Sequence, residues 1–535
     1  MPRIPMANAD EIGMVADAST NEMDPRAFSL IKNARIQDGS VERIQGHQPA
    51  LKPPPSGQDP LWTLFAPLQQ DNYWIWASPS KVYSYTAGGT HTDITRASGA
   101  YNAGPRAWNG GIFNGIFFCN NGADPPQVWL NPAPGTPLVD LPNWPAGTLA
   151  KYMSCYKNYM VALYITKTST VFPQMVKWSH VADAGSIPTS WDVTDPTKDA
   201  GEFPLAETPG ILMGQMTMRD ANIIYKNDSV YAMTLSGGTS IFRFQRILKE
   251  GGLLAPYGMA KFNLQGEKHI VLSSDDVFVH DGNTATAILQ RRLRKWLYAN
   301  MDASTFQNSF IVINAAKTEA WICFPSNGAY YPDMALVYNY RNQSLTVREL
   351  PVISYASTGV LDDIMGAGSG GIWENDLDIW DNDKTNWGER SYNPASDKIL
   401  YAKPGTNRQF YAADVTDYFD GVPFTTTLER DGITITGQDM SGKPIQDLAV
   451  VKLLSYIWPR IETDANLDFQ YFVGTQEKRE DEIAWEGPFD YDPKTERHLC
   501  PLVSGLIISI KLVVTTAGFF KYNGYDIQIG PVGSW

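Results

Sequence analysis

The chain has 535 residues, 43% of them hydrophobic and 12% aromatic, and its formal net charge is −14. This acidity argues against a protein that grips nucleic acid by neutralising phosphates. No run of about 18 apolar residues is present, so no membrane insertion is expected, and the opening MPRIPMANADEIG lacks the pattern of a secretory signal.

The many aromatic residues, together with 44 Gly and 36 Pro, indicate short strands joined by turns. We therefore predict an all-β fold. Residues 1–55 are mostly polar and run into the stiff, proline-rich stretch Lys52–Pro60. We predict that residues 1–55 form an N-terminal arm and linker that docks elsewhere and contributes to a platform domain.

Residues 56–425 contain a recurring unit: a valine, a nearby aromatic residue, a turn and a return strand. The valines are Val82, Val128, Val176, Val230, Val277 and Val337. Successive valines are 46, 48, 54, 47 and 60 residues apart, a spacing typical of four-stranded propeller blades. The pattern predicts a β-propeller of about six blades, or seven. The alternative is another β-protein whose hairpins merely resemble one another.

One inserted helix is predicted over residues 284–300, with Asn283 as its N-cap. Its apolar face would comprise Ile288, Leu289, Leu293, Trp296 and Leu297. The opposite face is either a phosphate-contacting patch or a solvated or subunit-facing surface, and it carries Arg291, Arg294 and Lys295.

The repeat breaks over residues 361–393, where a glycine-rich stretch precedes alternating tryptophan and acidic residues. We interpret this range as an inserted loop that gates a channel or contacts another subunit. The tryptophans expected to do so are Trp373, Trp380 and Trp387. The expected hinges are Gly366, Gly368 and Gly371.

The same loop is dense in carboxylates, which are the ligands that calcium prefers. The spacing does not fit a calcium-binding EF-hand loop, because Asn386 stands where that loop needs glycine. We therefore predict no metal site. The carboxylates that come nearest to one are Asp376, Asp378, Asp381 and Asp383.

Residues 426–535 are predicted to form a C-terminal β-sandwich, the body of the platform. Asp431 and Gly432 separate two strand-like runs, which predicts a hairpin turn at these residues. Longer strands are expected within 450–462, 467–477 and 505–516. The last of these alternates apolar side chains, as a half-buried antiparallel strand does.

Residues that could carry catalysis are scattered. The six histidines include no H-E-x-x-H pair, and the chain has no G-x-S-x-G motif. The four cysteines are far apart, without a C-x-x-C pair, and are expected to be buried, reduced thiols of a protein made in a cytoplasm. We predict no enzymatic activity and no cofactor.

Three stretches resemble the tail nozzle proteins, also called tail tubular or stabilization proteins, of short-tailed bacteriophages (podoviruses). The first is Asn21–His47, with KNA at Lys32–Ala34 and RIQG at Arg43–Gly46. The second is the tryptophan and aspartate alternation at 373–387, and the third is Phe519–Gly533, FFKYNGYDIQIGPVG. Together they cover under a fifth of the chain.

The resemblance implies a virion structural protein made in the host bacterial cytoplasm. Nozzle proteins form a hexameric ring at the distal end of the tail tube, attached to an adaptor ring and in some cases to a tail fibre or spike. The DNA genome is ejected through the ring without sequence-specific binding. Six copies would carry a formal charge of −84, six times −14, so acidic walls would let DNA slide.

Two alternatives stay open. The chain could be a glycan-binding propeller or receptor-binding tail protein, with exposed tryptophans of the 361–393 loop stacked on sugar rings. It could also be a propeller glycosidase, in which two of the loop carboxylates act as acid and base.

Overall fold

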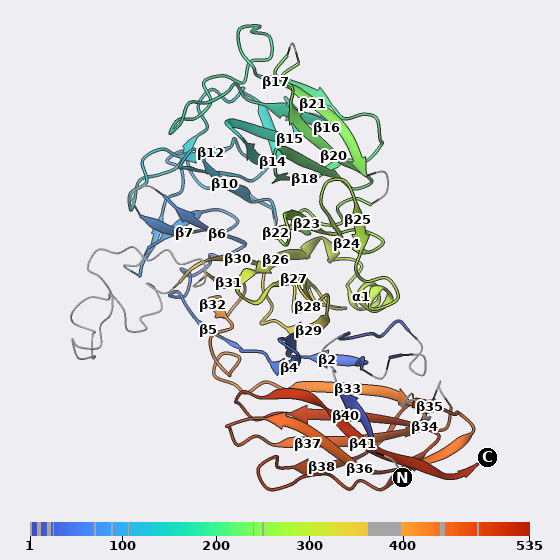
Figure 1. Ribbon diagram of the computed structural model, residues 1–535. Coiled ribbons are helices and arrows are strands. Elements are labelled where there is room, and N and C mark those ends of the chain that lie inside the picture. Colours follow the sequence, from blue (N-terminus) through green and yellow to red (C-terminus); the bar gives the residue numbers. More distant parts are fainter. Residues whose placement is uncertain are drawn as a thin grey trace.

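A computed structural model describes residues 3–7, 12–18, 23–24, 26–68, 71–86, 89–104, 106–238, 240–248, 251–361, 397–438, 444–478 and 481–534. Within these residues most of the chain is β-strand, and seven four-stranded antiparallel units follow one another (Figure 1). We call them blades 1 to 7. The chain is an all-β protein that contains a β-propeller.

Blades 1 to 4 each use four consecutive strands. Blade 1 contains β6 (Trp62–Pro67), β7 (Asn72–Ala77), β8 (Val82–Tyr85) and β9 (His91–Asp93). Blade 2 contains β10 (Asn109–Phe113), β11 (Ile116–Asn120), β12 (Gln127–Trp129) and β13 (Val139–Asp140). Blade 3 contains β14 (Thr148–Tyr156), β15 (Tyr159–Lys167), β16 (Thr170–Trp178) and β17 (Gly201–Pro204). Blade 4 contains β18 (Leu212–Met218), β19 (Ala221–Lys226), β20 (Val230–Leu235) and β21 (Phe242–Leu248).

Blades 5 and 6 continue the same order, whereas blade 7 borrows a strand from the N-terminal region. Blade 5 contains β22 (Met259–Asn263), β23 (Glu267–Leu272), β24 (Val277–His280) and β25 (Ala285–Ala287). Blade 6 contains β26 (Phe310–Asn314), β27 (Glu319–Phe324), β28 (Met334–Asn339) and β29 (Leu345–Glu349). Blade 7 contains β30 (Tyr355–Val360), β31 (Asp397–Lys403), β32 (Gln409–Ala413) and β5 (His47–Pro49).

The blades close into a ring. The first strands of most neighbouring blades lie against one another, β18 of blade 4 meets β23 of blade 5, and β30 of blade 7 meets β6 of blade 1. Apolar side chains fill each space between blades, as period-two alternation requires. In β31, for example, Ile399 and Tyr401 pack toward blade 6, while Leu400 and Ala402 pack toward blade 1.

The valine repeat locates the third strand of six blades. The six valines lie on β8, β12, β16, β20, β24 and β28. The repeat missed blade 7, whose third strand carries Phe410 and Tyr411 without a valine. Its outer strand comes from the opposite end of the chain, so no local hairpin signals it. Of the two blade numbers expected, six and seven, the described strands form seven.

Both chain ends build the second body, which we call the terminal domain. One of its sheets has the order β3-β4-β41-β36-β39, with β1 also paired to β41. These strands are β1 (Arg3–Ala7), β3 (Ala34–Gln37), β4 (Ser40–Arg43), β36 (Val450–Glu462), β39 (Val503–Gly505) and β41 (Lys521–Ser534).

The second sheet of the terminal domain is continuous with blade 6. Its nine strands run β26-β27-β28-β29-β2-β33-β40-β37-β38. The strands beyond blade 6 are β2 (Leu30–Lys32), β33 (Thr426–Ile433), β40 (Ile507–Val514), β37 (Phe469–Gln476) and β38 (Ala484–Tyr491). A separate pair is formed by β34 (Ile435–Gln438) and β35 (Pro444–Gln446). Ile508 and Leu512 of one sheet share a buried core with Ile527 and Leu454 of the other.

Two local predictions were wrong. The helix α1 spans only Arg294–Asn300, and the single-turn 3-10 helices η1 (Phe306–Asn308) and η2 (Ala315–Lys317) follow it. Residues 285–287 form β25, because the Asp281 carboxylate accepts the N–H groups of Asn283 and Thr284 and turns the chain back onto β24. Leu289, Leu293 and Leu297 are still buried, as expected of the apolar face.

The hairpin predicted at Asp431 and Gly432 is a bulge inside β33. The pairing of β33 with β40 skips from Arg430 to Ile433, and Gly432 has a φ of 73°. A glycine at positive φ suits a bulge as well as a turn. The long strand survives because both of its flanks pair with β40.

Candidate functional site at the junction of propeller and terminal domain

The loop singled out by sequence lies outside the described residues. This applies to Trp373, Trp380, Trp387, Gly366, Gly368, Gly371, Asp376, Asp378, Asp381 and Asp383. Among the described residues, no group of three or more His, Cys, Asp or Glu side chains could hold a metal ion. No helix of the described ranges is long and apolar enough to cross a membrane.

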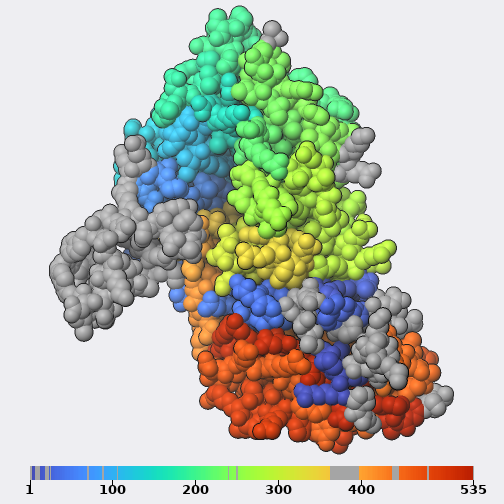
Figure 2. Space-filling view, in the orientation of Figure 1, coloured from blue at the N-terminus to red at the C-terminus, as the bar shows by residue number. Residues whose placement is uncertain are grey.

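A buried polar region lies at the junction, where N-terminal residues lie between the propeller and the C-terminal strands (Figure 2). Strand β2 pairs in parallel with β29 of blade 6 and antiparallel with β33. Immediately after it, Asn33 is fully buried with a φ of 57°. Its amide donates to Glu349 Oε2 and to the Thr425 carbonyl, each at 2.8 Å, and its Oδ1 accepts the Glu349 N–H at 2.9 Å. One side chain thus holds both bodies.

Four buried charges, which we call the junction quartet, lie beside Asn33: Arg35, Glu319, Arg348 and Asp414. The two Asp414 oxygens each accept one arginine at 2.6 Å, Oδ2 from Arg35 and Oδ1 from Arg348. Arg35 Nε lies 3.1 Å from Glu319 Oε1. The quartet has no net charge, and it joins β3 of the terminal domain to blade 6 and to the end of blade 7.

Neutral partners complete the quartet. The Trp321 indole donates to Glu319 Oε2 at 2.8 Å, and its ring lies 4.4 Å from the Arg348 guanidinium carbon. Arg348 also donates to the Gln45 carbonyl at 3.0 Å. Buried charges are tolerated only when paired and hydrogen-bonded in this way.

Electrostatics keep the shared carboxylate ionised. Burial alone would raise the pKa of Asp414, but Arg348 and Arg35 outweigh it and lower that pKa to about 2. Burial raises the pKa of Glu319, and Arg35 opposes this. The four side chains hold one another in fixed positions, so what the described residues show here is a structural connection.

A second connection passes through Arg43 and Gly46. Arg43 donates to the carbonyls of Thr516, Gly518 and Phe424, and it stacks on the Phe424 ring at 4.4 Å. The Gly46 backbone lies so close to the Tyr418 carbonyl that a Cβ added at Gly46 would overlap it. Arg43 therefore ties β4 to the chain just before β41, and Gly46 lets the chain pass into blade 7.

A different buried cluster, which we call the His–Tyr–His chain, joins blades 4 and 5. The Gly282 N–H donates to His280 Nδ1 at 3.3 Å, so His280 Nε2 carries a proton and donates to the Tyr225 oxygen at 2.7 Å. The Tyr225 hydroxyl donates to His269 Nδ1 at 2.7 Å, and His269 Nε2 lies 3.1 Å from the Thr217 carbonyl. All three side chains are buried.

Burial keeps this chain neutral. It lowers the pKa of His269 to about 3 and that of His280 to about 4, and it raises the pKa of Tyr225. No nucleophile or open cavity adjoins these groups in the described residues. The sequence showed only scattered histidines, yet the β23–β24 hairpin pairs His269 directly with His280. A prediction of the strand register in that hairpin would have placed the two histidines opposite each other.

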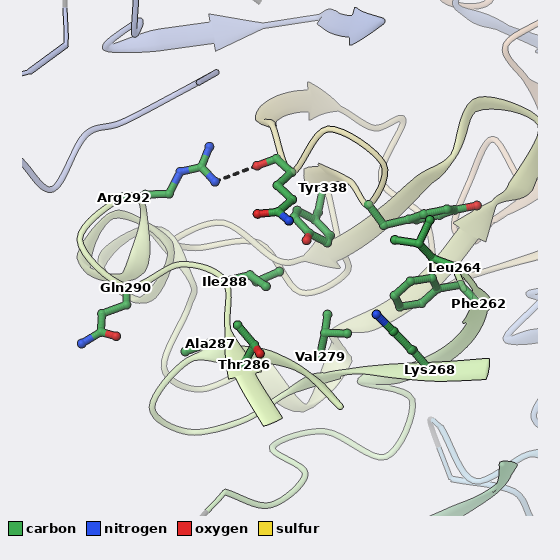
Figure 3. Close-up of a pocket in the computed structure, with 12 residues that line it drawn as sticks. Phe262, Leu264, Lys268, Val279, Thr286, Ala287, Ile288, Gln290, Arg292 and Tyr338 are labelled. Atoms are coloured by element: carbon green, nitrogen blue, oxygen red, sulfur yellow. Dashed lines mark hydrogen bonds between the residues drawn. The ribbon is translucent and has the colours of Figure 1, made fainter. Parts of the chain in front are cut away.

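The surface of the described residues includes two open pockets that bear on function. The first, of about 310 Å³, lies between blades 5 and 6 near α1 (Figure 3). Its lining includes Phe262, Val279, Tyr338, Lys268 and Arg292. The second, of about 490 Å³, lies at the ends of β37 and β38 and is lined in part by Asp468, Asp490, Asp492 and Glu496.

The remaining sequence candidates are placed as follows. Arg294 lies 3.9 Å from Asp275, and Arg291 and Lys295 are exposed. The N–H groups of Lys295 and Trp296 donate to the Asp17 carboxylate, so the N-terminal arm caps α1. All four cysteines are free; Cys119 and Cys323 are buried, Cys155 is half-buried, and Cys500 is exposed, against the expectation that all are buried.

No protein-family model matches the chain, and no curated protein matches it. The crystal structure of the computationally designed Ika8 protein is similar at 10% identity with a TM-score of 0.34, covering 69% of this chain and all of that one. The Pan2 WD40 domain of Neurospora crassa is similar at 10% identity with a TM-score of 0.35, covering 71% of this chain and 98% of that one. The propeller described above rests on the strand pairing.

Proposed function

We propose that this chain is a structural, non-enzymatic subunit of the tail of a short-tailed bacteriophage. Six copies form a nozzle ring at the distal end of the tail tube, attached to the adaptor ring, and the DNA genome leaves through the ring. The terminal domain acts as the platform that contacts the adaptor, and a tail fibre or spike docks on the assembled ring.

One observation carries the proposal. The first and third stretches that resemble nozzle proteins, Asn21–His47 and Phe519–Gly533, lie side by side although they come from opposite ends of the chain. Val41 and Glu42 of β4 pair with Tyr522 and Lys521 of β41. The motif residues Asn33, Arg43 and Gly46 are those that hold the junction. Two matches that serve one structural unit support a shared architecture better than two unrelated matches would.

The connection between the propeller and the terminal domain is of the kind that a conduit under mechanical load requires. Blade 6 continues through β2 into the terminal domain as one hydrogen-bonded sheet, and the junction quartet braces the same place. A subunit that must keep its shape while DNA passes needs its two bodies fixed to each other. Passive connections of this kind, rather than catalytic groups, are what the described junction offers.

Charge is distributed unevenly along the chain. Residues 47–361 and 397–425, which hold the seven blades apart from the inserted segment, contain 26 Lys and Arg against 26 Asp and Glu. Residues 1–46 and 426–535 together carry −8, and residues 362–396 carry −6. We therefore assign the lubrication of DNA to the terminal domain and to the 362–396 segment, since the propeller itself is neutral.

The test is the mass and shape of the purified chain, measured by light scattering and negative-stain microscopy with and without its adaptor. Rings of six with a central hole, formed alone or on the adaptor, would support the nozzle. A monomer or trimer that never makes a ring would overturn it. Glycan binding that is lost in Trp380→Ala would then favour the receptor-binding alternative.

A further inference from the structure

The pocket between blades 5 and 6 has an aromatic floor. The rings of Phe262 and Tyr340 stack at 4.6 Å and 28°, and Tyr338, Val279 and Ile288 complete the apolar lining. Its volume of about 310 Å³ lies at the lower end of the range for ligand pockets. It therefore suits one large aromatic side chain better than an extended ligand.

Cations surround this floor. Lys268 extends across the pocket beside Phe262, and Arg292 reaches over the opposite wall, where it donates to the Gln343 carbonyl at 2.7 Å (Figure 3). Arg291 and Arg341 are exposed nearby in sequence. Arg292 also donates to the Ile12 carbonyl and is therefore held in place. Within the described residues Lys268, Arg291 and Arg341 form no ion pair with a carboxylate, so these three remain available to an acidic partner.

The chain itself contains a segment of the complementary chemistry. Between Trp373 and Trp387 the sequence has three tryptophans, five Asp or Glu residues and a single lysine. Its structure lies outside the described residues, but its composition fits the pocket: an indole matches the aromatic floor, and carboxylates match Lys268, Arg291 and Arg341.

We propose that the pocket between blades 5 and 6 of one copy binds the Trp373–Trp387 segment of a second copy, with one indole ring in the cavity and the adjoining carboxylates on Lys268 and Arg341. The proposed contact adds a specific interface to the proposed ring, and it rests on that proposed function for the arrangement of the subunits. It identifies one surface through which neighbouring subunits recognise each other.

The position of the segment favours a second copy over the same chain. The segment is flanked by β30 and β31 of blade 7, whereas the pocket lies on blades 5 and 6 beside α1. Figure 1 shows β31 and α1 on opposite flanks of blade 6. A closed ring of like subunits brings one flank of each copy against the opposite flank of the next, which places the segment of one copy at the pocket of its neighbour.

The first experiment uses a fluorescein-labelled peptide of residues 370–390 and measures its binding to the full chain by fluorescence anisotropy. The double variant Lys268→Glu/Arg341→Glu should bind it at least about ten-fold more weakly, because two attractive contacts become repulsive. The matched control Lys157→Glu/Arg243→Glu makes the same charge change at exposed positions on blades 3 and 4 and should bind like the parent. Equal binding by all three proteins would overturn the pocket assignment.

The second experiment exchanges the charges between copies. A chain with Lys268→Glu/Arg341→Glu is mixed with a chain carrying Asp376→Lys/Asp378→Lys, and association is followed by sedimentation velocity. Each variant alone should associate less than the parent, and the mixture should recover association. Recovery only when all four changes are in one chain, together with monomeric sedimentation, would show that the segment folds back on its own pocket and would overturn the second-copy contact.

The outcomes separate this inference from the proposed function. Rings that persist in Lys268→Glu/Arg341→Glu, with unchanged stability and unchanged peptide binding, would remove the pocket contact and leave the nozzle standing. Peptide binding at the pocket in a chain that pairs but never makes a ring, with or without adaptor, would remove the nozzle and leave the contact between copies standing.

Discussion

The junction quartet and the His–Tyr–His chain are both sealed from water, yet one consists of four charges and the other of three neutral groups. The quartet gathers residues 35, 319, 348 and 414 from three parts of the chain. The His–Tyr–His chain links residues on adjoining strands of neighbouring blades. Of these two clusters, the charged one lies where distant segments converge, and the neutral one lies between two consecutive blades.

The difference has an energetic side. A buried charge that loses its partner keeps its full desolvation cost, whereas a neutral group loses only hydrogen bonds. The quartet is therefore a stringent connection, which forms only when the N-terminal segment that carries Arg35 lies against blades 6 and 7. The His–Tyr–His chain contributes less to stability, and it orients two blades that apolar packing already holds together.

The largest effect is expected from breaking the quartet. Asp414→Asn keeps the size of the side chain but leaves two buried arginines without their shared anion, and it should lower the free energy of unfolding by about 3–5 kcal/mol. Urea unfolding followed by tryptophan fluorescence measures this. Asp183→Asn, at an exposed carboxylate on blade 3, is the control and should change little. A loss below about 1 kcal/mol would mean that water reaches the quartet.

Acid should separate the two clusters by pH. His269 and His280 have folded pKa values near 3 and 4, whereas unfolded histidine titrates near 6.5. As pH falls below about 6.5 only the unfolded chain takes up these protons, so these two histidines together should lower the free energy of unfolding by about 2–3 kcal/mol between pH 7.5 and 5.5. Asp414 keeps its contribution in this window, because its lowered pKa, about 2, delays the loss of that contribution to between about 3.8 and 2.

The comparison protein for that measurement is His269→Gln/His280→Gln. It should be less stable than the parent at pH 7.5 but should lose less stability on acidification, since two of the buried neutral histidines are gone. His47, whose pKa burial also lowers to about 3, remains in both proteins. Parallel pH profiles for the two proteins would show that the pair does not stay neutral in the fold.

Removing the central hydroxyl tests the neutral cluster directly. Tyr225→Phe leaves His280 Nε2 and His269 Nδ1 without their shared partner and should cost about 1–2 kcal/mol in the same urea unfolding assay. Tyr330→Phe, at a side chain that is 52% exposed, is the matched control and should be neutral. If Tyr225→Phe cost as much as Asp414→Asn, the distinction between charged and neutral clusters would fail.

The smallest effect is expected where both partners meet water. Lys81 and Asp93 of blade 1 form an ion pair at 2.7 Å with both side chains about 40% exposed. Lys81→Met should lower the unfolding free energy by less than about 1 kcal/mol, and 0.5 M salt should erase the difference by screening. A larger loss that persists in salt would show that burial is not what separates this pair from the quartet.

The sequence by itself determined the β class and most of the propeller. Aromatic, Gly and Pro content indicated short strands, and the valine repeat marked the third strand of six blades. The strand expected within 450–462 matches β36, Val450–Glu462. These signals were readable because side-chain alternation and tight turns are set by residues close together in the chain.

Prediction from local sequence failed at two places where the same residue pattern is compatible with two different structures. Apolar residues spaced as on a helix at 288–297 belong to a loop and a short helix, and the Asp431–Gly432 pair belongs to a bulge rather than a hairpin. In both places the pairing partner of the neighbouring residues decided the outcome. That partner, β24 for the first and β40 for the second, is not visible in the local sequence.

Only the tertiary structure decided the seventh blade, the continuous nine-stranded sheet and the two buried clusters. Each depends on pairing between segments that are far apart in the chain: β5 with β32, β2 with β29 and β33, and Asp414 with Arg35. Asn33, Arg43 and Gly46 stood within a recognised motif, but their roles follow from what lies opposite them. Long-range β pairing has no fixed spacing in sequence, since its register is chosen by burial of whole faces and not by neighbouring residues.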